Sequence, residues 1–311
     1  MRYVITGGNS FLGVALCKQL VANQHEVIVA CRKHSKIGDI PQSPLVDIVR
    51  YEGLHDMSTL LSIGHADVFI HLAWNGTGHD GRDNHEIQEQ NIAYSLEAVG
   101  LANNLGCKLF VESGSQAEYG IVQGKMLETT ECHPQNEYGR AKLVFGELAS
   151  QKCQELGMKF IHLRILSVFG ETDHPWTLVM SCIRKMLDNE DVQLSSCEQL
   201  WNFVSVSDAA KQIYLLSQSA MAKDGFESEI YLIGSNDTRV LRSFVDEIYH
   251  LTKSKSKLLF GAHPVSNVVS LNPLMSKTEK TTGGFISDHT FGEVVMKIIN
   301  KYKKENYDKG F

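Results

Sequence analysis

Short apolar runs alternate with longer segments of helical spacing over the first half of the chain. We expect strands at RYVIT (2–6), EVIVA (26–30), LVDIVRY (45–51), ADVFIHLA (66–73), KLFVES (108–113) and KFIHLRI (159–165), with helices near 11–23, 84–105 and 136–156. Strands that are apolar throughout lie between two layers of helices. The alternation therefore predicts an α/β fold with a doubly wound parallel sheet.

The pattern becomes less regular after residue 167. Helical spacing recurs near residues 176–188, 207–221, 239–253 and 290–304, and the charged segment KYKKENYDKGF (301–311) is typical of a solvated tail. We expect residues 1–166 to form the sheet domain and residues 167–311 to form mainly a smaller C-terminal lid that binds the substrate. Residues around 200–220 are expected to return to the sheet domain.

Composition and charge limit the kind of partner. The chain has 311 residues, 43% of them hydrophobic, and a formal net charge of −6, so we expect a sizeable core and no nucleic-acid partner. Its seven cysteines form no CxxC pair and no zinc-like spacing, which favours free thiols in the cytosol. Because strand-like sequence begins at Arg2 and no apolar stretch approaches about 18 residues, we expect neither a signal peptide nor a membrane span.

The segment TGGNSFLG (6–13) joins the first expected strand to the first expected helix. At this place backbone N–H groups and a helix N-terminus can hold the pyrophosphate of a dinucleotide. Gly7 and Gly13 have the spacing of the first and third glycines of such a loop, whereas Ser10 occupies the middle position. Residues 1–166 are therefore expected to be a dinucleotide-binding Rossmann domain.

Tyr138 and Lys142 are four residues apart in a helical segment, so their side chains emerge on one face. A nearby ammonium group stabilises the phenolate and lowers the tyrosine pKa from about 10. Ser115 stands just beyond a predicted strand, at the edge of the sheet where ligands bind. The three side chains are therefore expected to converge on one proton-transfer site.

These motifs occur in order with several others: HLAW (71–74), Asn91 in NIAYS, Ser115 four residues before Tyr119-Gly120, LRILSVFG (163–170) and NFVSVSDAA (202–210). Together they resemble the extended short-chain dehydrogenases/reductases, in the nucleotide-sugar epimerase/dehydratase group. The resemblance runs from residue 2 to about residue 300.

The resemblance implies that Tyr138 exchanges a proton with a sugar oxygen, that Ser115 hydrogen-bonds the same oxygen, and that Lys142 holds the nicotinamide ribose. It implies a set of cofactor-binding residues: Gly7, Asn9, Ser10, Phe11, Leu12, Gly13, Arg32, Lys33, Leu72, Ala73, Trp74, Asn91, Tyr138 and Lys142. It implies substrate contacts from Trp74, Ser115, Gln116, Ser167 and Trp201. For each of the two tryptophans, the alternative is that the side chain only packs against other residues of the protein. No metal ion is expected, because His71, His79 and His85 lack ligand spacing.

The residues after Ser115 bear on the choice among dehydratase, epimerase and reductase. In the family's dehydratases an Asp-Glu pair follows this position and expels the C6 hydroxyl, whereas this chain has Gln116 and Ala117. Glu118, one position further, is expected to point elsewhere. Dehydration is therefore disfavoured.

Arg32 and Lys33 follow the second expected strand, with Cys31 where a ribose-binding carboxylate is usual. A 2′-phosphate requires the loss of that carboxylate and a nearby cation, so the pattern favours NADP over NAD. Since the family's reductases consume NADPH, the resemblance implies reduction of a nucleotide-linked 4-keto-6-deoxyhexose, as in the CDP-abequose synthase type. The alternatives are an NAD-bound epimerase, in which both cations are solvated, and a non-catalytic protein on the same fold.

Three departures from the family pattern concern ligand contacts: Leu54 replaces an adenine-binding Asp, Ser167 replaces an Asn, and Trp201 replaces an Arg that meets the nucleotide diphosphate. The candidates for a replacement phosphate contact are Arg239, Arg242 and Lys277.

Two further expectations concern surfaces. The loop NGTGHDGRDNHE (75–86) is a candidate to cover the sugar. The resemblance also implies a homodimer formed through the helices near 84–105 and 136–156.

Overall fold

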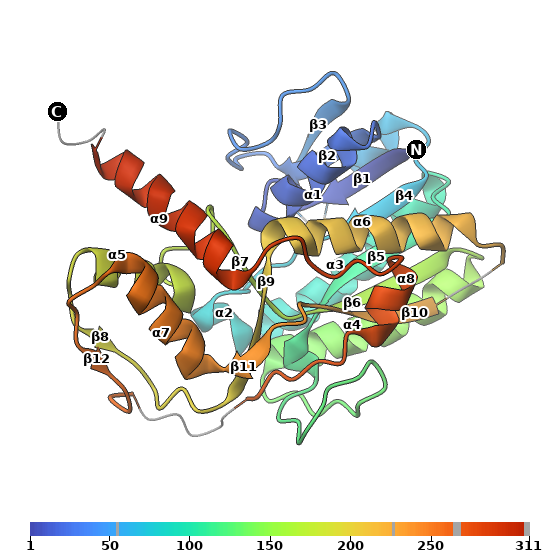
Figure 1. Cartoon of the computed structure of the whole chain (residues 1–311). Coiled ribbons are helices and arrows are strands. Elements are labelled where there is room, and N and C mark those ends of the chain that lie inside the picture. Colours follow the sequence, from blue (N-terminus) through green and yellow to red (C-terminus); the bar gives the residue numbers. More distant parts are fainter. Residues whose placement is uncertain (54–55, 226–227, 264–268, 308–311) are drawn as a thin grey trace.

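A seven-stranded parallel sheet forms the centre of the protein (Figure 1). The computed structural model describes residues 1–53, 56–225, 228–263 and 269–307. The strands are β1 (Arg2–Thr6), β2 (Glu26–Arg32), β3 (Val46–Tyr51), β4 (Val68–His71), β5 (Leu109–Ser115), β6 (Lys159–Ile165) and β10 (Ser228–Ile233). Their order in the sheet is β10-β6-β5-β4-β1-β2-β3, and every neighbouring pair is parallel. The predicted doubly wound sheet is confirmed.

Helices cover both faces of the sheet, which explains why its inner strands are mostly apolar. On one face lie α1 (Phe11–Ala22) and α6 (Val206–Ala222), and on the other α3 (His85–Asn104) and α4 (Glu137–Glu155). Successive strand residues point to opposite faces. Tyr3 and Ile5 of β1 are buried with α1 and α6, whereas Val4 between them is buried with α3 and α4.

The seventh strand comes from the second half of the chain. After β6 the chain leaves the sheet, returns as α6 against α1, and then adds β10 beside β6, with Ser228 opposite Phe160. The sequence indicated the return of residues 200–220 but gave no sign of β10.

A second group of elements packs beside the sheet (Figure 1). Its helices are α5 (Leu178–Leu187), α7 (Leu241–Thr252) and α9 (Phe291–Tyr307), and its strands are β7 (Ser167–Phe169), β8 (Val192–Gln193), β9 (Leu200–Ser205), β11 (Thr238–Val240) and β12 (Leu258–Leu259). The side chains of Phe203, Phe244 and Phe291 meet in its core. The charged segment that begins at residue 301 is helical as far as Tyr307, because α9 continues three residues beyond the expected helix end at 304.

Short elements complete the described chain: η1 (Ser58–Ile63), α2 (His79–Arg82), η2 (Gln116–Glu118) and α8 (Ser276–Thr281). Within residues 1–53, 56–225, 228–263 and 269–307, no helix combines the length and the apolar character that crossing a bilayer requires. The carboxyl ends of β1, β2, β4 and β5 share one edge of the sheet. The glycine loop, Arg32, Leu72 and Ser115 therefore gather at that edge.

Candidate active site

A pocket of about 530 Å³ lies between this edge of the sheet and the elements β7, α5 and β9. It brings together eight residues that the sequence singled out: Leu72, Trp74, Ser115, Gln116, Tyr138, Lys142, Ser167 and Trp201. All five expected substrate contacts and all three expected proton-transfer residues are among them. The sequence therefore located this pocket from segments that are far apart in the chain.

The start of α4 places Tyr138 and Lys142. Asn136 caps the helix, because its side-chain oxygen accepts a hydrogen bond from the backbone N–H of Gly139 at 2.8 Å. One helical turn then puts Tyr138 and Lys142 on the face toward β5, where they are 9% and 1% exposed.

Lys142 is held from two sides. Its Nζ donates to the carbonyl oxygen of Ser113 at 2.5 Å and lies 3.6 Å from the centre of the Trp74 ring. Burial lowers the pKa of Lys142 to about 8, although the carboxylates of Glu112 and Glu118 act in the opposite direction. The amine is therefore close to its titration range at physiological pH.

Opposing effects also act on the pKa of the Tyr138 phenol. Burial raises its pKa, while the Arg82 guanidinium and a hydrogen bond with Ser115 act to lower it. Arg82 lies 4.8 Å from the centre of the Tyr138 ring. The sequence-based expectation named Lys142 as the cation that lowers this pKa and missed Arg82. The raised pKa keeps the phenol protonated at neutral pH, as a proton donor requires.

Two buried amides hold the loop that follows β4. Gln88 accepts a hydrogen bond from Trp74 Nε1 at 2.8 Å and donates to the carbonyl oxygen of Gly81 at 2.8 Å. Asn91 exchanges two hydrogen bonds with the backbone of Asn75, at 2.9 and 3.0 Å. Asn91 therefore positions Asn75, and it is not among the residues that line the larger pocket.

A second pocket, of about 140 Å³, adjoins the first and shares Leu72 and Trp74 with it. Its other lining residues are Gly7, Asn9, Ser10, Arg32, Tyr51, Ala73 and Asn75. Gly7 has a φ of +67°, and a Cβ there would lie 2.9 Å from the backbone nitrogen of Ala73. The residues present therefore fit a dinucleotide that runs from the glycine loop to Lys142.

Of the six expected cofactor residues between Gly7 and Gly13, three do not line this smaller pocket. Phe11 faces another cavity, Leu12 packs against the core under α1, and Gly13 donates its backbone N–H to Ser10 Oγ at 3.1 Å. Leu12 thus packs against the core, and Gly13 takes part in the helix cap.

The side chains of Arg32, which ends β2, and Lys33, which follows it, point to different places. Arg32 lines the smaller pocket, whereas Lys33 forms an exposed ion pair with Glu52 at 2.7 Å. Cys31 is fully buried, so Arg32 and not the preceding position faces the expected ribose site. Lys33 does not contribute to the pocket, because strand alternation and Glu52 direct it away.

Trp201 lines the larger pocket and also packs near Phe203, with the ring centres 6.4 Å apart. The three cations considered as replacements for a diphosphate-binding arginine are engaged elsewhere. Arg239 pairs with Asp237 and Glu247, Arg242 stacks on Phe260, and Lys277 pairs with Glu229. Leu54 lies outside the described residues.

Several lining residues were missed by the sequence reasoning: Tyr51 in the smaller pocket, and Thr77, Arg82, Asp173 and Thr177 in the larger one. The loop containing Thr77 and Arg82 was identified as a possible cover, and it does line the pocket. Arg82 and Lys142 supply the positive charge among the described lining residues. The glycines near Arg82, in the loop at 75–86, were the sequence feature that could have drawn attention to this residue.

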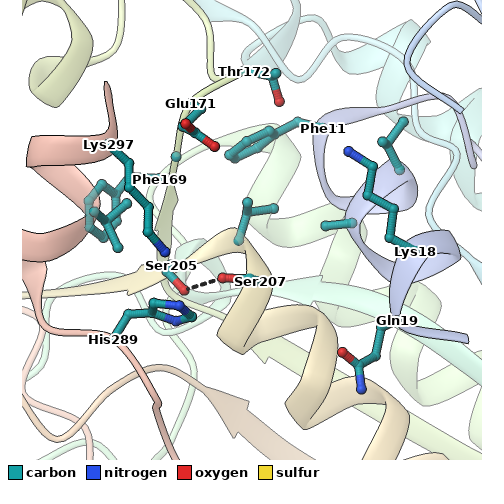
Figure 2. Close-up of a pocket in the computed structure, with 15 residues that line it drawn as sticks. Phe11, Lys18, Gln19, Phe169, Glu171, Thr172, Ser205, Ser207, His289 and Lys297 are labelled. Atoms are coloured by element: carbon teal, nitrogen blue, oxygen red, sulfur yellow. Dashed lines mark hydrogen bonds between the residues drawn. The ribbon is translucent and has the colours of Figure 1, made fainter. Parts of the chain in front are cut away.

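A further pocket, of about 400 Å³, lies between α1, the start of α6 and α9 (Figure 2). Phe11 and Phe169 are among the residues that line it. His289 is paired with Asp208 at 3.1 Å, and Ser205 is bonded to Ser207 at 3.0 Å. None of the expected proton-transfer residues lines this cavity.

The fold and the larger pocket define an extended short-chain dehydrogenase/reductase. A profile of the NAD dependent epimerase/dehydratase family matches residues 3–234. The chain belongs to that family.

Relatives and solved structures agree with this assignment. The chain is 26% identical over 280 residues to dTDP-6-deoxy-L-talose 4-dehydrogenase (NAD(+)) of Aggregatibacter actinomycetemcomitans, covering 87% of this chain and 98% of that protein. It is 24% identical over 312 residues to CDP-abequose synthase of Salmonella muenchen, covering 96% and 97%. The fold matches that of UDP-N-acetylglucosamine 4-epimerase from Methanobrevibacter ruminantium M1 in complex with UDP-N-acetylmuramic acid, with a TM-score of 0.86, 18% identity and 98% coverage of both chains.

Proposed function

We propose that the protein is an NADPH-dependent reductase of the 4-keto group of a nucleotide-linked 4-keto-6-deoxyhexose. The observation that carries the proposal is the convergence of Ser115, Tyr138 and Lys142 in the larger pocket, next to the smaller pocket lined by Arg32. The similarity to CDP-abequose synthase and to a dTDP-6-deoxy-L-talose 4-dehydrogenase supports chemistry at C4 of a nucleotide sugar.

In this proposal Tyr138 donates its phenolic proton to the C4 oxygen as the ketone becomes an alcohol. When bound, the nicotinamide supplies the hydride that reaches C4. Ser115 donates a hydrogen bond to the same oxygen and polarises the carbonyl group. Lys142 binds the nicotinamide ribose and, in its charged form, stabilises the phenolate that Tyr138 leaves behind.

The residues after Ser115 support reduction over dehydration. Gln116 lines the pocket but has no acidic proton, and Ala117 has no polar side chain. Glu118 is fully buried and bonded to His162 and Arg164, on the side away from the pocket. No carboxylic acid is therefore available in this segment to protonate a leaving C6 hydroxyl.

The choice of NADPH rests on Arg32, which faces the expected ribose site in the smaller pocket. The second candidate is an NAD-bound epimerase, favoured by the fold match to a 4-epimerase and by the NAD(+) in the name of one relative. Both candidates use the same proton-transfer residues, so the reductant separates them.

The test is incubation of the purified protein with NADPH or NADH and a panel of CDP- and dTDP-4-keto-6-deoxyhexoses, followed by cofactor absorbance. We expect stoichiometric NADPH oxidation with one nucleotide sugar. Isomerisation of a nucleotide sugar without net cofactor oxidation would replace this proposal by the epimerase.

Tyr138→Phe is expected to lower kcat about 10²- to 10⁴-fold, the usual contribution of general acid catalysis, with little change in NADPH binding. Tyr94→Phe, on α3, is the matched control and is expected to retain turnover. Unchanged turnover in Tyr138→Phe would contradict the assignment of the proton donor.

A further inference from the structure

A cluster of four buried charged residues lies behind Ser115: Glu112, Glu118, His162 and Arg164, none of them more than 5% exposed. None of them lines the larger pocket. Glu118 accepts hydrogen bonds from the backbone N–H of Ser115 at 2.6 Å, from His162 Nε2 at 2.7 Å and from Arg164 Nε at 2.9 Å. Buried charges carry a large desolvation cost, so a cluster beside an active site requires explanation.

His162 is the centre of the cluster. Its imidazole pairs with Glu112 on one side and with Glu118 on the other. Burial opposes the charged form, but the carboxylates of Glu118 and Glu112 raise the pKa of His162 to about 10. A Cβ at Gly114 or Gly146 would lie 2.6 Å from the imidazole ring, so both positions must lack a side chain for the ring to fit.

The cluster is bonded directly to the backbone that carries the catalytic serine. Ser115 and Glu118 form a capping box: Ser115 Oγ accepts from the backbone N–H of Ala117 at 3.1 Å, while Glu118 accepts from the backbone N–H of Ser115. Two residues earlier, the carbonyl oxygen of Ser113 accepts the Lys142 hydrogen bond. The position of Ser115 and the anchor of Lys142 therefore lie on one short segment that Glu118 holds.

Charge links the cluster to Lys142 as well. Of the groups that act on its ammonium, Glu112 on β5 and Glu118 on η2 favour the charged form. His71 on β4 is neutral at physiological pH, since burial and Lys142 lower its pKa to about 3. Tyr138 on α4 is protonated, and His162 and Arg164 on β6 offset part of the negative charge. The two carboxylates are thus the groups that counter the desolvation of Lys142.

We propose that Glu118 is a positioning residue of the active site: it fixes the Ser115 turn, which also carries the carbonyl group that anchors Lys142, and it supplies negative charge near the Lys142 amine. The proposal rests on the redox function above, which gives Ser115 and Lys142 their roles. Glu118 touches neither pocket and acts through these two residues.

Trp74 provides a readout that needs no turnover, because the Lys142 ammonium lies against its ring. The chain has three tryptophans, so Trp176→Phe/Trp201→Phe leaves Trp74 as the sole indole. Its fluorescence is then titrated against pH. We expect an inflection near pH 8 in this background, because burial lowers the pKa of Lys142 to about 8, and loss of the inflection in Lys142→Met.

Two substitutions in that background are expected to shift the pH of the inflection in opposite directions. Glu118→Gln removes negative charge and should move the inflection about one pH unit lower or more, as expected for loss of a nearby opposite charge. His162→Gln removes positive charge and should move it higher. The exposed Glu155→Gln is the matched control and should leave it in place.

An unmoved inflection in Glu118→Gln, or shifts of the same sign in both variants, would overturn the proposal. If Glu118→Gln does not fold by circular dichroism, His162→Gln decides alone: a higher inflection supports the proposal and an unchanged or lower one overturns it. In turnover assays, the alkaline limb of the plot of kcat against pH should move in the same direction as the fluorescence inflection. Failure of every sugar to oxidise NADPH would remove the proposed function but leave the titration of Lys142 intact.

Discussion

Replacing Arg32 with Asp is the sharpest test of cofactor choice. Arg32 lines the smaller pocket, and Arg50 fixes the turn around it by donating to the carbonyl oxygens of Arg32 at 3.3 Å and Lys33 at 2.5 Å. A hydrogen bond to a charged group contributes about 1.5–3 kcal/mol, and the lower half of that range suits an exposed side chain. The aspartate adds repulsion toward a 2′-phosphate.

Together these effects give a loss of about 2–3 kcal/mol for NADP⁺, or about 30- to 150-fold in Kd. NAD⁺ lacks the 2′-phosphate, so its Kd should change by less than about 3-fold, within the range of a surface substitution. Isothermal titration calorimetry with both cofactors measures the two values directly.

Lys33→Asp is the matched control, since Lys33 carries the same charge one residue further on but pairs with Glu52. It should change neither affinity by more than about 3-fold. An equal loss of NADP⁺ and NAD⁺ in Arg32→Asp would refute the assignment of Arg32 to a 2′-phosphate and favour the epimerase.

Three other predictions follow from the contacts described. Gly146→Ala should destabilise the protein by about 1–3 kcal/mol through overpacking against His162, seen as a lower Tm, whereas Gly38→Ala, whose added Cβ would meet no heavy atom within 4 Å, should not; equal melting would contradict the close approach. Arg82→Ala should raise the KM for the anionic nucleotide sugar about tenfold with a smaller effect on kcat, and Arg184→Ala, on α5 outside the larger pocket, should not; an unchanged KM would refute an ionic contact. If α3 and α4 form a dimer interface, Leu148→Glu, at a position 40% exposed on α4, should give a monomer by light scattering while Leu259→Glu does not, and a monomeric wild type would remove that proposal.

The sequence predicted the sheet well, because strands buried on both faces leave apolar runs that a local pattern reveals. It predicted that Ser115, Tyr138 and Lys142 lie together for a related reason. Ligands bind at the carboxyl ends of parallel strands, and residues four apart share one face of a helix. It could not distinguish Arg32 from Lys33, since their divergence depends on Glu52, which belongs to a neighbouring segment. Arg82 escaped notice because only tertiary packing brings its loop over Tyr138.

The second group of elements, beside the sheet, was predicted less completely. Its helices α5, α7 and α9 have clear apolar periodicity, whereas β7 and β11 are only three residues long and contain too few positions to show alternation. β10 was missed because it begins with exposed and partly buried polar residues, Ser228 and Glu229, and becomes apolar only near its end. Its partner β6 lies far earlier in the chain, so no local signal marks the pairing.

The late arrival of β10 also has a consequence for synthesis on the ribosome. Until residues 228–233 have emerged, β6 is the outer strand of a partly built sheet, with unpaired backbone groups along its free side. A nascent chain that has already made Ser115, Tyr138 and Lys142 would therefore still expose an edge that pairs readily with other chains. Translation pauses between α6 and β10 are expected to promote aggregation more than pauses after β10, which pulse-labelled synthesis with staged stalling sequences can measure.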